Sequence, residues 1–400
     1  MNLRQLVRAV TGFVVLAPGL ALSADDLPNR TSPSKRDDAE LTASHDYSAD
    51  RRYPVTHNVD FRVVVTPPNH CHQLRVWLPI PQSDAAQTID QTELSTFPRQ
   101  VQPAIAIEPV YGNKFAYFEF HHPQGAQIIQ HRFQVRVWEL NWHVDPAQVL
   151  TIRSWPPSFR PYLQPQEIWQ NIEYQGVLSE ISPRGSNAAA DLWNVMDWVD
   201  RSLVYDHSQA SLQADANHAF ELRRGHCSDY HGLCATMGRA LGYPTRITYG
   251  LSLFPKNSPS HCKLEAFLPP YGWVSYDVSE TQKLIHRIAT QDELTAEQKR
   301  DYAAAARARL QSGFRENSWL LLTRGTDYEL VPAASRPVRV VRTIYAEADG
   351  VPLSEPDPAN GQQREFAWMT AHRFRSDVPV RKPFEDVSTL TLTRPVGQAN

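Results

Sequence analysis

Cysteine is scarce in this 400-residue chain, which has only Cys71, Cys227, Cys234 and Cys262. So few thiols exclude a disulfide-stapled scaffold, and each cysteine therefore needs its own explanation. A large excess of charge of one sign is also missing, because the formal net charge is −3 at pH 7. Such a balance gives no broad field to attract nucleic acid, so no nucleic-acid partner is expected.

Long apolar runs are missing as well, apart from a mostly apolar stretch at residues 9–22 that follows Arg4 and Arg8. This stretch is shorter than the roughly 20 residues that a membrane-spanning helix needs, and small residues such as Ser23 follow it. The pattern predicts a secretory signal peptide over residues 1–24. We therefore expect an exported protein, periplasmic or secreted, without a membrane span after cleavage, and an uncleaved anchor is the alternative.

The rest of the chain divides into segments of different pattern. Residues 25–54 are polar and lack an apolar period, which predicts a disordered linker. Residues 55–145 largely alternate polar and apolar side chains between Pro, Gly and Asn, which predicts an N-terminal β-sandwich domain. Residues 146–347 are expected to form a second domain, and residues 348–400 a C-terminal extension with little readable pattern.

Helical and strand patterns both occur in the second domain. Residues 188–204 place apolar side chains at helical spacing, and residues 291–311 have a strong helix composition. Further strand candidates follow at residues 319–322 and 338–345. The whole chain is therefore predicted to be α+β.

One segment carries a possible nucleophile, Cys227. Gly225 and His226 precede it, and an apolar stripe spaced by four residues follows it as far as Gly242. This pattern predicts a helix that has Cys227 in its first turn. A thiol there feels the positive end of the helix dipole, which favours the reactive thiolate, and the same backbone N–H groups could hold an oxyanion.

Two predicted strands after this helix supply partners for the thiol. His261 opens a strand that ends at Leu268, and a short turn leads to a second strand followed by Asp277. Such an antiparallel hairpin brings side chains near its outer ends together. A cysteine nucleophile needs a base to take its proton, and the base needs a carboxylate to orient it. Cys227, His261 and Asp277 are therefore the predicted catalytic triad.

The residues around the triad resemble a known family. The resemblance lies in Gly225–Tyr230, Arg239–Arg246, His261 and Gly272–Asp277. Together they resemble the core of the transglutaminase-like superfamily, over roughly residues 188–284, in its bacterial exported type with an N-terminal β domain. The resemblance implies a papain-like fold, in which a catalytic helix packs on an antiparallel sheet.

Two features next to the triad are less regular. Members of the family usually follow the histidine with a small residue and an aromatic one, where this chain has Cys262 and Lys263. This departure makes the shape and charge of the substrate channel uncertain. A second oxyanion donor is predicted at either Trp193 or Tyr205, upstream of the nucleophile.

The predicted chemistry is acyl transfer on amide bonds of protein or peptide substrates, through a thioester on Cys227. Water as acceptor gives a peptidase, isopeptidase or deamidase, and a lysine amine gives a cross-linking transglutaminase. Hydrolysis is favoured because water is always present. No cofactor is required, and no acidic loop has the spacing of a calcium site. The alternative is a non-catalytic adaptor that binds peptides or cell-envelope components, which would not need a matched triad.

The remaining histidines and cysteines favour no further site. His70–His72 and His121–His122 lack a paired ligand set at zinc-site spacing, so no metal is expected. Because strand side chains alternate, Cys262 is predicted to lie on the opposite sheet face from His261. This argues against a bridge between Cys262 and Cys227, and no essential disulfide is predicted.

Overall fold

Long strands make up the first part of the computed structural model, which describes residues 41–44, 47–182, 187–256, 259–356 and 367–392. Those strands are β1 (Asp50–Val65), β2 (Gln73–Ile80), β3 (Gln87–Phe97), β4 (Ala104–Ile107), β5 (Lys114–His121) and β6 (Gln127–Asn141). Along β1 and β6, buried side chains alternate with more exposed ones. Each strand therefore turns one face toward a core, as the period-two pattern predicted.

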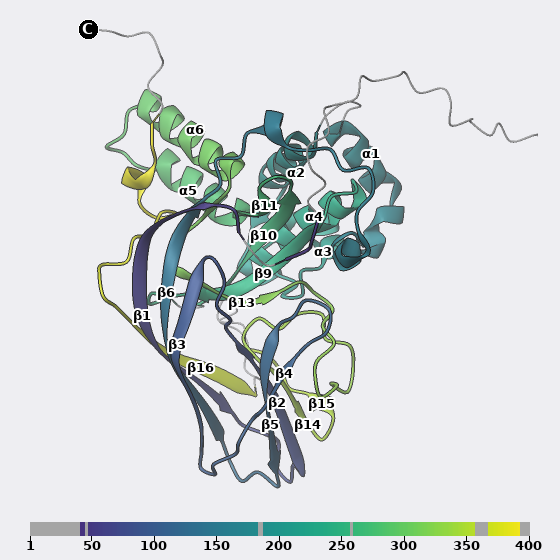
Figure 1. Cartoon of the computed structure of the whole chain (residues 1–400), viewed down its shortest axis with the longest axis vertical. Coiled ribbons are helices and arrows are strands. Elements are labelled where there is room, and N and C mark those ends of the chain that lie inside the picture. Colours follow the sequence, from purple (N-terminus) through teal and green to yellow (C-terminus); the bar gives the residue numbers. More distant parts are fainter. Residues whose placement is uncertain (1–40, 45–46, 183–186, 257–258, 357–366, 393–400) are drawn as a thin grey trace, which may run out of the picture. The chain divides into compact units, whose positions relative to one another are not determined.

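Two antiparallel sheets share these strands (Figure 1). The first has the order β12 (Phe314–Arg315), β6, β1, β16 (Trp368–Ser376), and β3 also pairs with β6. The second has the order β15 (Val351–Pro352), β14 (Tyr345–Ala348), β2, β5, β4. One apolar cluster joins both sheets, with members such as Phe61, Val76, Phe118 and Val135. The predicted strand-rich N-terminal region is confirmed.

Both sheets also take strands from the end of the chain. β16 pairs with β1 over the whole run from His57↔Ser376 to Val65↔Trp368. The description of residues 348–400 as an extension without pattern therefore missed a full strand. The strand predicted over residues 338–345 is wrong except at its last residue, because Val338 forms only an isolated bridge to Tyr328. The boundaries of the separate domains stay predictions.

A mixed helical and sheet region lies between these strands in the sequence. Its helices are α1 (Ile172–Ile181), α2 (Ala188–Ser202), α3 (Ala216–Leu222), α4 (Cys227–Ala240), α5 (Val278–Ala289) and α6 (Ala296–Ser312). Its antiparallel sheet has the order β11 (Gly272–Tyr276), β10 (Ser260–Leu268), β9 (Thr245–Ser252), β13 (Trp319–Arg324). Helix α4 packs on β10 and β9. The predicted α+β class, with a helix against an antiparallel sheet, is confirmed.

Short elements complete the architecture. The two-residue strands β7 (Val204–Tyr205) and β8 (Arg224–Gly225) pair in parallel just before α4. Short 3₁₀ helices occupy Pro146–Gln148, Pro157–Tyr162, Glu167–Gln170, His207–Gln209 and Val387–Thr389. In the part of the chain that the structure describes, no helix is long and apolar enough to cross a membrane.

The last part of the predicted linker, residues 25–54, belongs instead to the folded unit. Residues 42–400 form one compact unit, and β1 already starts at Asp50. Tyr47 is buried, and its hydroxyl donates to Glu265 at 2.7 Å. Glu265 is itself a buried carboxylate paired with Arg246, so this tertiary contact outweighs the polar local sequence. The predicted signal peptide at residues 1–24 lies outside the described residues.

Candidate active site

Cys227 is the first residue of α4, as its sequence context predicted. The His226 side chain accepts from the Ser228 N–H, and the Asp229 carboxylate accepts from the His226 N–H at 2.9 Å. This capping box fixes the point at which the helix starts. The Cys227 thiol consequently lies beside the unpaired N–H groups and the positive end of the helix dipole.

His261 and Asp277 meet at the end of the predicted hairpin. His261 is the second residue of β10, and Asp277 directly follows β11. His261 Nε2 lies 2.7 Å from Asp277 Oδ2. Asp277 also caps α5, because its Oδ1 accepts from the Glu280 N–H at 3.0 Å. One carboxylate therefore orients the imidazole and anchors a helix.

Cys227 and His261 form a charged pair. Because Asp277 holds Nε2, Nδ1 is the ring nitrogen of His261 left to exchange a proton with the thiol. Burial alone would lower the pKa of His261, but the charges of Asp277 and Cys227 outweigh it and raise the pKa to about 9. The pKa of Cys227 is well below its usual value. These opposite shifts favour a thiolate paired with an imidazolium.

Cys262 contributes directly to this low pKa, a role that its predicted place on the sheet face opposite to His261 did not suggest. A side-chain hydrogen bond from Cys262 is the largest cause of the lowered pKa of Cys227, ahead of the charges of His226 and His261. Helix α4 packs on β10, and Cys262 faces it, with its Sγ 3.6 Å from Nδ1 of His231. His261 reaches the same thiol from the strand's end. All four cysteines carry free thiols.

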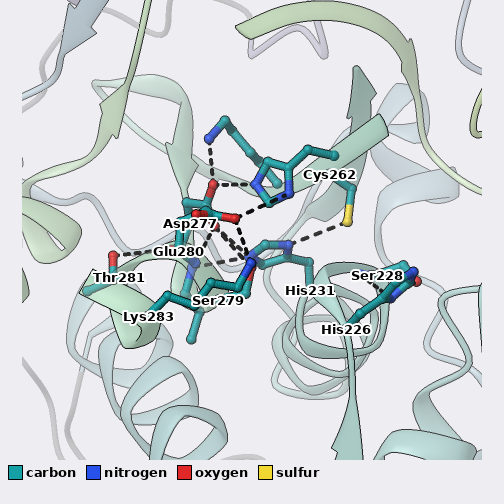
Figure 2. A network of polar contacts seen from close by, with 12 residues as sticks. His226, Ser228, His231, Cys262, Asp277, Ser279, Glu280, Thr281 and Lys283 are labelled. Atoms are coloured by element: carbon teal, nitrogen blue, oxygen red, sulfur yellow. Dashed lines mark hydrogen bonds and ion pairs between the residues drawn. The ribbon is translucent and has the colours of Figure 1, made fainter. Parts of the chain in front are cut away.

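His231 supports both Cys262 and Asp277, and sequence reasoning missed it. Its Nε2 accepts from the Val278 N–H at 3.1 Å, so its Nδ1 carries the proton and faces Cys262 Sγ at 3.6 Å. Burial lowers the pKa of His231 to about 4, so the ring is neutral. Figure 2 shows His231 between Cys262 and Asp277. The available signal was its position one helical turn after Cys227, on the same face of α4.

Lys263 lies between Asp277 and Glu316, and neither Lys263 nor Glu316 was a predicted site residue. Lys263 Nζ lies 2.5 Å from Asp277 Oδ2 and 2.9 Å from Glu316 Oε2, and the lysine is fully buried. Burial raises the pKa of Asp277, but the charges of Lys263 and His261 outweigh it, so the pKa lies well below its usual value. Asp277 is therefore ionised at neutral pH.

The two residues predicted as oxyanion donors occupy different surroundings. Tyr205 pairs with Gly225 in the β7–β8 ladder, two residues before Cys227. Burial and the charge of Cys227 raise the pKa of Tyr205 well above its usual value, so its hydroxyl keeps its proton. Trp193 lies half-buried on α2, and among the described residues no hydrogen bond joins it to the triad. The surroundings favour Tyr205 over Trp193.

The centre of the site is nearly closed to solvent. Cys227 and His261 expose only 7% and 5% of their surface. A small cavity beside His261 is lined also by Phe254, Glu316 and Phe384. An amide substrate therefore has to enter through this cavity or displace the side chains that cover Cys227 and His261.

No group of side chains suited to a metal ion occurs among the residues that the structure describes. His72 and His122, from the two histidine-rich stretches, do lie close together, with ring centroids 5.3 Å apart. Their side chains are exposed and gather no third ligand in the described chain.

The fold and the site define the class of proteins with a transglutaminase-like core. Residues 176–278 match the model of the transglutaminase-like superfamily, which places Cys227, His261 and Asp277 inside the matched segment. The chain therefore carries a transglutaminase-like core, the fold of a group of cysteine-dependent enzymes.

Individual relatives are distant. A crystal structure of a proposed cysteine protease from Cytophaga hutchinsonii has a TM-score of 0.56 and 12% identity, and the similarity covers 86% of this chain and 98% of that one. The periplasmic domain of TgpA from Pseudomonas aeruginosa has 18% identity and a TM-score of 0.28, over 55% of this chain and 89% of that one. An uncharacterised protein from Haemophilus influenzae is 25% identical over 158 residues, which are 34% of this chain and 41% of that relative. The matched segment thus spans well under half of that relative's length.

Proposed function

We propose that this protein is an exported cysteine enzyme that transfers acyl groups from amide bonds of protein or peptide substrates. The observation that carries the proposal is the buried line from Cys227 through His261 to Asp277. It joins a thiolate at a helix N-terminus to an imidazolium held at 2.7 Å by an ionised carboxylate. A lone structural cysteine has no need of such partners.

The steps follow from the positions of these groups. The Cys227 thiolate attacks the amide carbonyl carbon, and the C–S bond forms while the carbonyl oxygen takes the negative charge. His261 gives its Nδ1 proton to the leaving nitrogen as the C–N bond breaks, which leaves a thioester. Water then attacks the thioester and gives its proton to His261, and the acid and the thiolate are released. A lysine amine in place of water gives an isopeptide bond.

The oxyanion that forms in the first step needs hydrogen-bond donors. The backbone N–H groups at the start of α4 supply one source, and the protonated hydroxyl of Tyr205 supplies a second. Tyr205 is held near Cys227 by the pairing of β7 with β8. We favour Tyr205 over Trp193 for this reason.

Hydrolysis is the favoured outcome of the thioester, as in the sequence interpretation. The cavity beside His261 is small, and its lining includes the carboxylates of Glu280 and Glu316. Water enters such a space more easily than a protein-bound lysine does. Peptidase, isopeptidase or deamidase activity is therefore favoured over cross-linking.

Labelling of the purified mature protein with a thiol-reactive amide mimic tests the proposal. We expect rapid labelling at neutral pH that is lost in Cys227→Ala and slowed at least tenfold in His261→Ala. Slow labelling with the rate of an ordinary thiol, unchanged in His261→Ala, would contradict the enzyme. The adaptor would then become the better explanation, and the limited exposure of Cys227 favours it. N-terminal sequencing of the protein from cell fractions tests export.

A further inference from the structure

Lys263 is a buried lysine next to the site, and its environment accounts for its charge. It stands two residues after His261 on β10, so both side chains lie on the same face of the strand. Its Nζ contacts Asp277 Oδ2 at 2.5 Å and Glu316 Oε2 at 2.9 Å. Burial opposes the charged form, but these two carboxylates outweigh it and raise the pKa of Lys263. The ammonium group is therefore present at neutral pH.

Two aromatic rings also lie close to this ammonium group. Lys263 Nζ lies 5.3 Å from the centre of the Trp319 ring and 5.1 Å from that of Phe384. These distances suit cation–π attraction, which is strongest in desolvated sites. Lys263 therefore cannot turn toward solvent without losing both ion pairs and both ring contacts.

The oxygen that Lys263 binds is the one that binds His261. Asp277 Oδ2 lies 2.5 Å from Lys263 Nζ and 2.7 Å from His261 Nε2. The other oxygen, Oδ1, accepts from the Glu280 N–H at 3.0 Å and the Ser279 hydroxyl at 3.2 Å. Figure 2 shows Asp277 among these contacts. With both oxygens occupied, the carboxylate cannot rotate, and its direction toward His261 is fixed.

We propose that Lys263 is a positioning residue of the acyl-transfer site, which holds Asp277 in place and tempers the basicity of His261. This inference rests on the proposed function of the same site. A cation that shares the Asp277 oxygen partly cancels the charge that stabilises the His261 imidazolium. The imidazolium consequently gives up its proton to a leaving amine more readily than it would with Asp277 alone. Glu316 balances the extra positive charge on the far side of Lys263.

The pH dependence of Cys227 alkylation by iodoacetamide separates this role from a merely structural one. In the wild type we expect two inflections, one where the thiolate forms and one near pH 9 where His261 loses its proton. The test compares the single variant Glu316→Gln with the double variant Lys263→Met/Glu316→Gln. Lys299→Met is the matched lysine control, because the Lys299 ammonium donates to Ala289 O at the surface. The double variant avoids leaving Glu316 without its cation.

In the double variant we expect the alkaline inflection to lie about half a pH unit or more above that of Glu316→Gln, because His261 loses a neighbouring cation. Lys299→Met should behave as the wild type. An alkaline inflection equal in the double variant and in Glu316→Gln would overturn the role of Lys263, even if the melting temperature falls. A wild type with a single inflection near that of a free thiol would instead overturn the proposed function.

Should the double variant not fold, Lys263→Arg provides the second test. Arginine keeps the cation but replaces the compact ammonium with a wider planar group. We expect the alkaline inflection to stay near its wild-type value while the plateau rate falls at least threefold, since Asp277 is displaced. An unchanged plateau rate would contradict the positioning role.

Discussion

At the residue scale, the low pKa of Cys227 depends on a second thiol, that of Cys262. Cys262 keeps its proton because burial and its hydrogen bond to Cys227 raise its pKa. The neutral His231 ring donates toward the Cys262 sulfur, which leaves the thiol hydrogen free to point at Cys227. A donor beside a thiolate stabilises it in the same way as the helix dipole does.

Cys262→Ala is therefore expected to raise the pKa of Cys227 by about one unit, which is roughly a tenfold loss of thiolate at acidic pH. The measurement is the acidic inflection of iodoacetamide alkylation at Cys227. Cys262→Ser, which keeps a donor, should restore most of the shift. Cys234→Ala is the control, because it removes a different buried thiol, which lies on α4. Equal inflections in Cys262→Ala and Cys234→Ala would disprove the role of Cys262.

Tyr205→Phe removes only a hydroxyl, so it tests the second oxyanion donor. We expect turnover of a hydrolysed amide substrate to fall by about 10²-fold with little change in KM, because the hydrogen bond is made mainly in the transition state. Trp193→Phe is the matched comparison. A loss in Trp193→Phe without a loss in Tyr205→Phe would assign the donor to Trp193 instead.

The sequence predicted the residues whose geometry is local and missed those that depend on packing. The position of Cys227 could be predicted because a glycine and an apolar helical stripe mark the start of its helix. The proximity of His261 to Asp277 could be predicted because a short turn makes their strands neighbours. Glu316 lies outside that hairpin, and only the packing of the segment between β12 and β13 brings it to Lys263.

At the scale of elements, the start of α4 sets the position of Cys227, and Gly225 allows the helix to start there. Gly225 has φ +152°, and a side chain added there would collide with the Asp229 carboxylate. Asp229 also binds the Ser211 hydroxyl and N–H, so it has no free direction in which to move. The capping box and the β7–β8 ladder thus meet at one glycine.

Gly225→Ala is expected to lower the free energy of unfolding by about 2 kcal/mol or more, because the collision involves a buried, fully bonded carboxylate. Alkylation of Cys227 should slow in the folded fraction, since the helix start shifts. Thermal unfolding followed by circular dichroism measures the first effect. Gly176→Ala, where an added methyl group meets no atom within 4 Å, is the control. Equal melting temperatures for the two variants would count against this account.

At the scale of the whole molecule, the late strands show what local sequence cannot reveal. β16 is half exposed along most of its length, so its apolar pattern is weak. The position of β16 is set by nine residue pairs with β1, a strand that lies more than 300 positions earlier in the chain. Pairing partners so distant leave no local trace, whereas the alternation of β1 and β6 is visible by itself.

Buried neutral histidines link the stability of the whole molecule to pH. His131 on β6 is buried and bonded to Thr92 at 2.8 Å, and burial lowers its pKa to about 4. His231 has a pKa of about 4 for the same reason. In the unfolded chain both should titrate near 6.5. Below that pH the unfolded state binds more protons than the folded state does. The stabilisation that the two neutral rings contribute is therefore complete above about pH 6.5 and is lost as pH falls toward 4.

His261 acts in the opposite direction, because its folded pKa of about 9 exceeds the unfolded value. Its stabilisation is complete below about pH 6.5 and is lost as pH rises through 9. The three histidines together predict a maximum of the melting temperature near pH 6.5. On the acidic side, each buried neutral ring lowers the free energy of unfolding by up to about 3 kcal/mol. His131→Gln, far from the site in sequence, should flatten the acidic decline between pH 6.5 and 4.5 and leave the alkaline decline unchanged. An acidic decline as steep as that of the wild type would show that His131 does not titrate on unfolding.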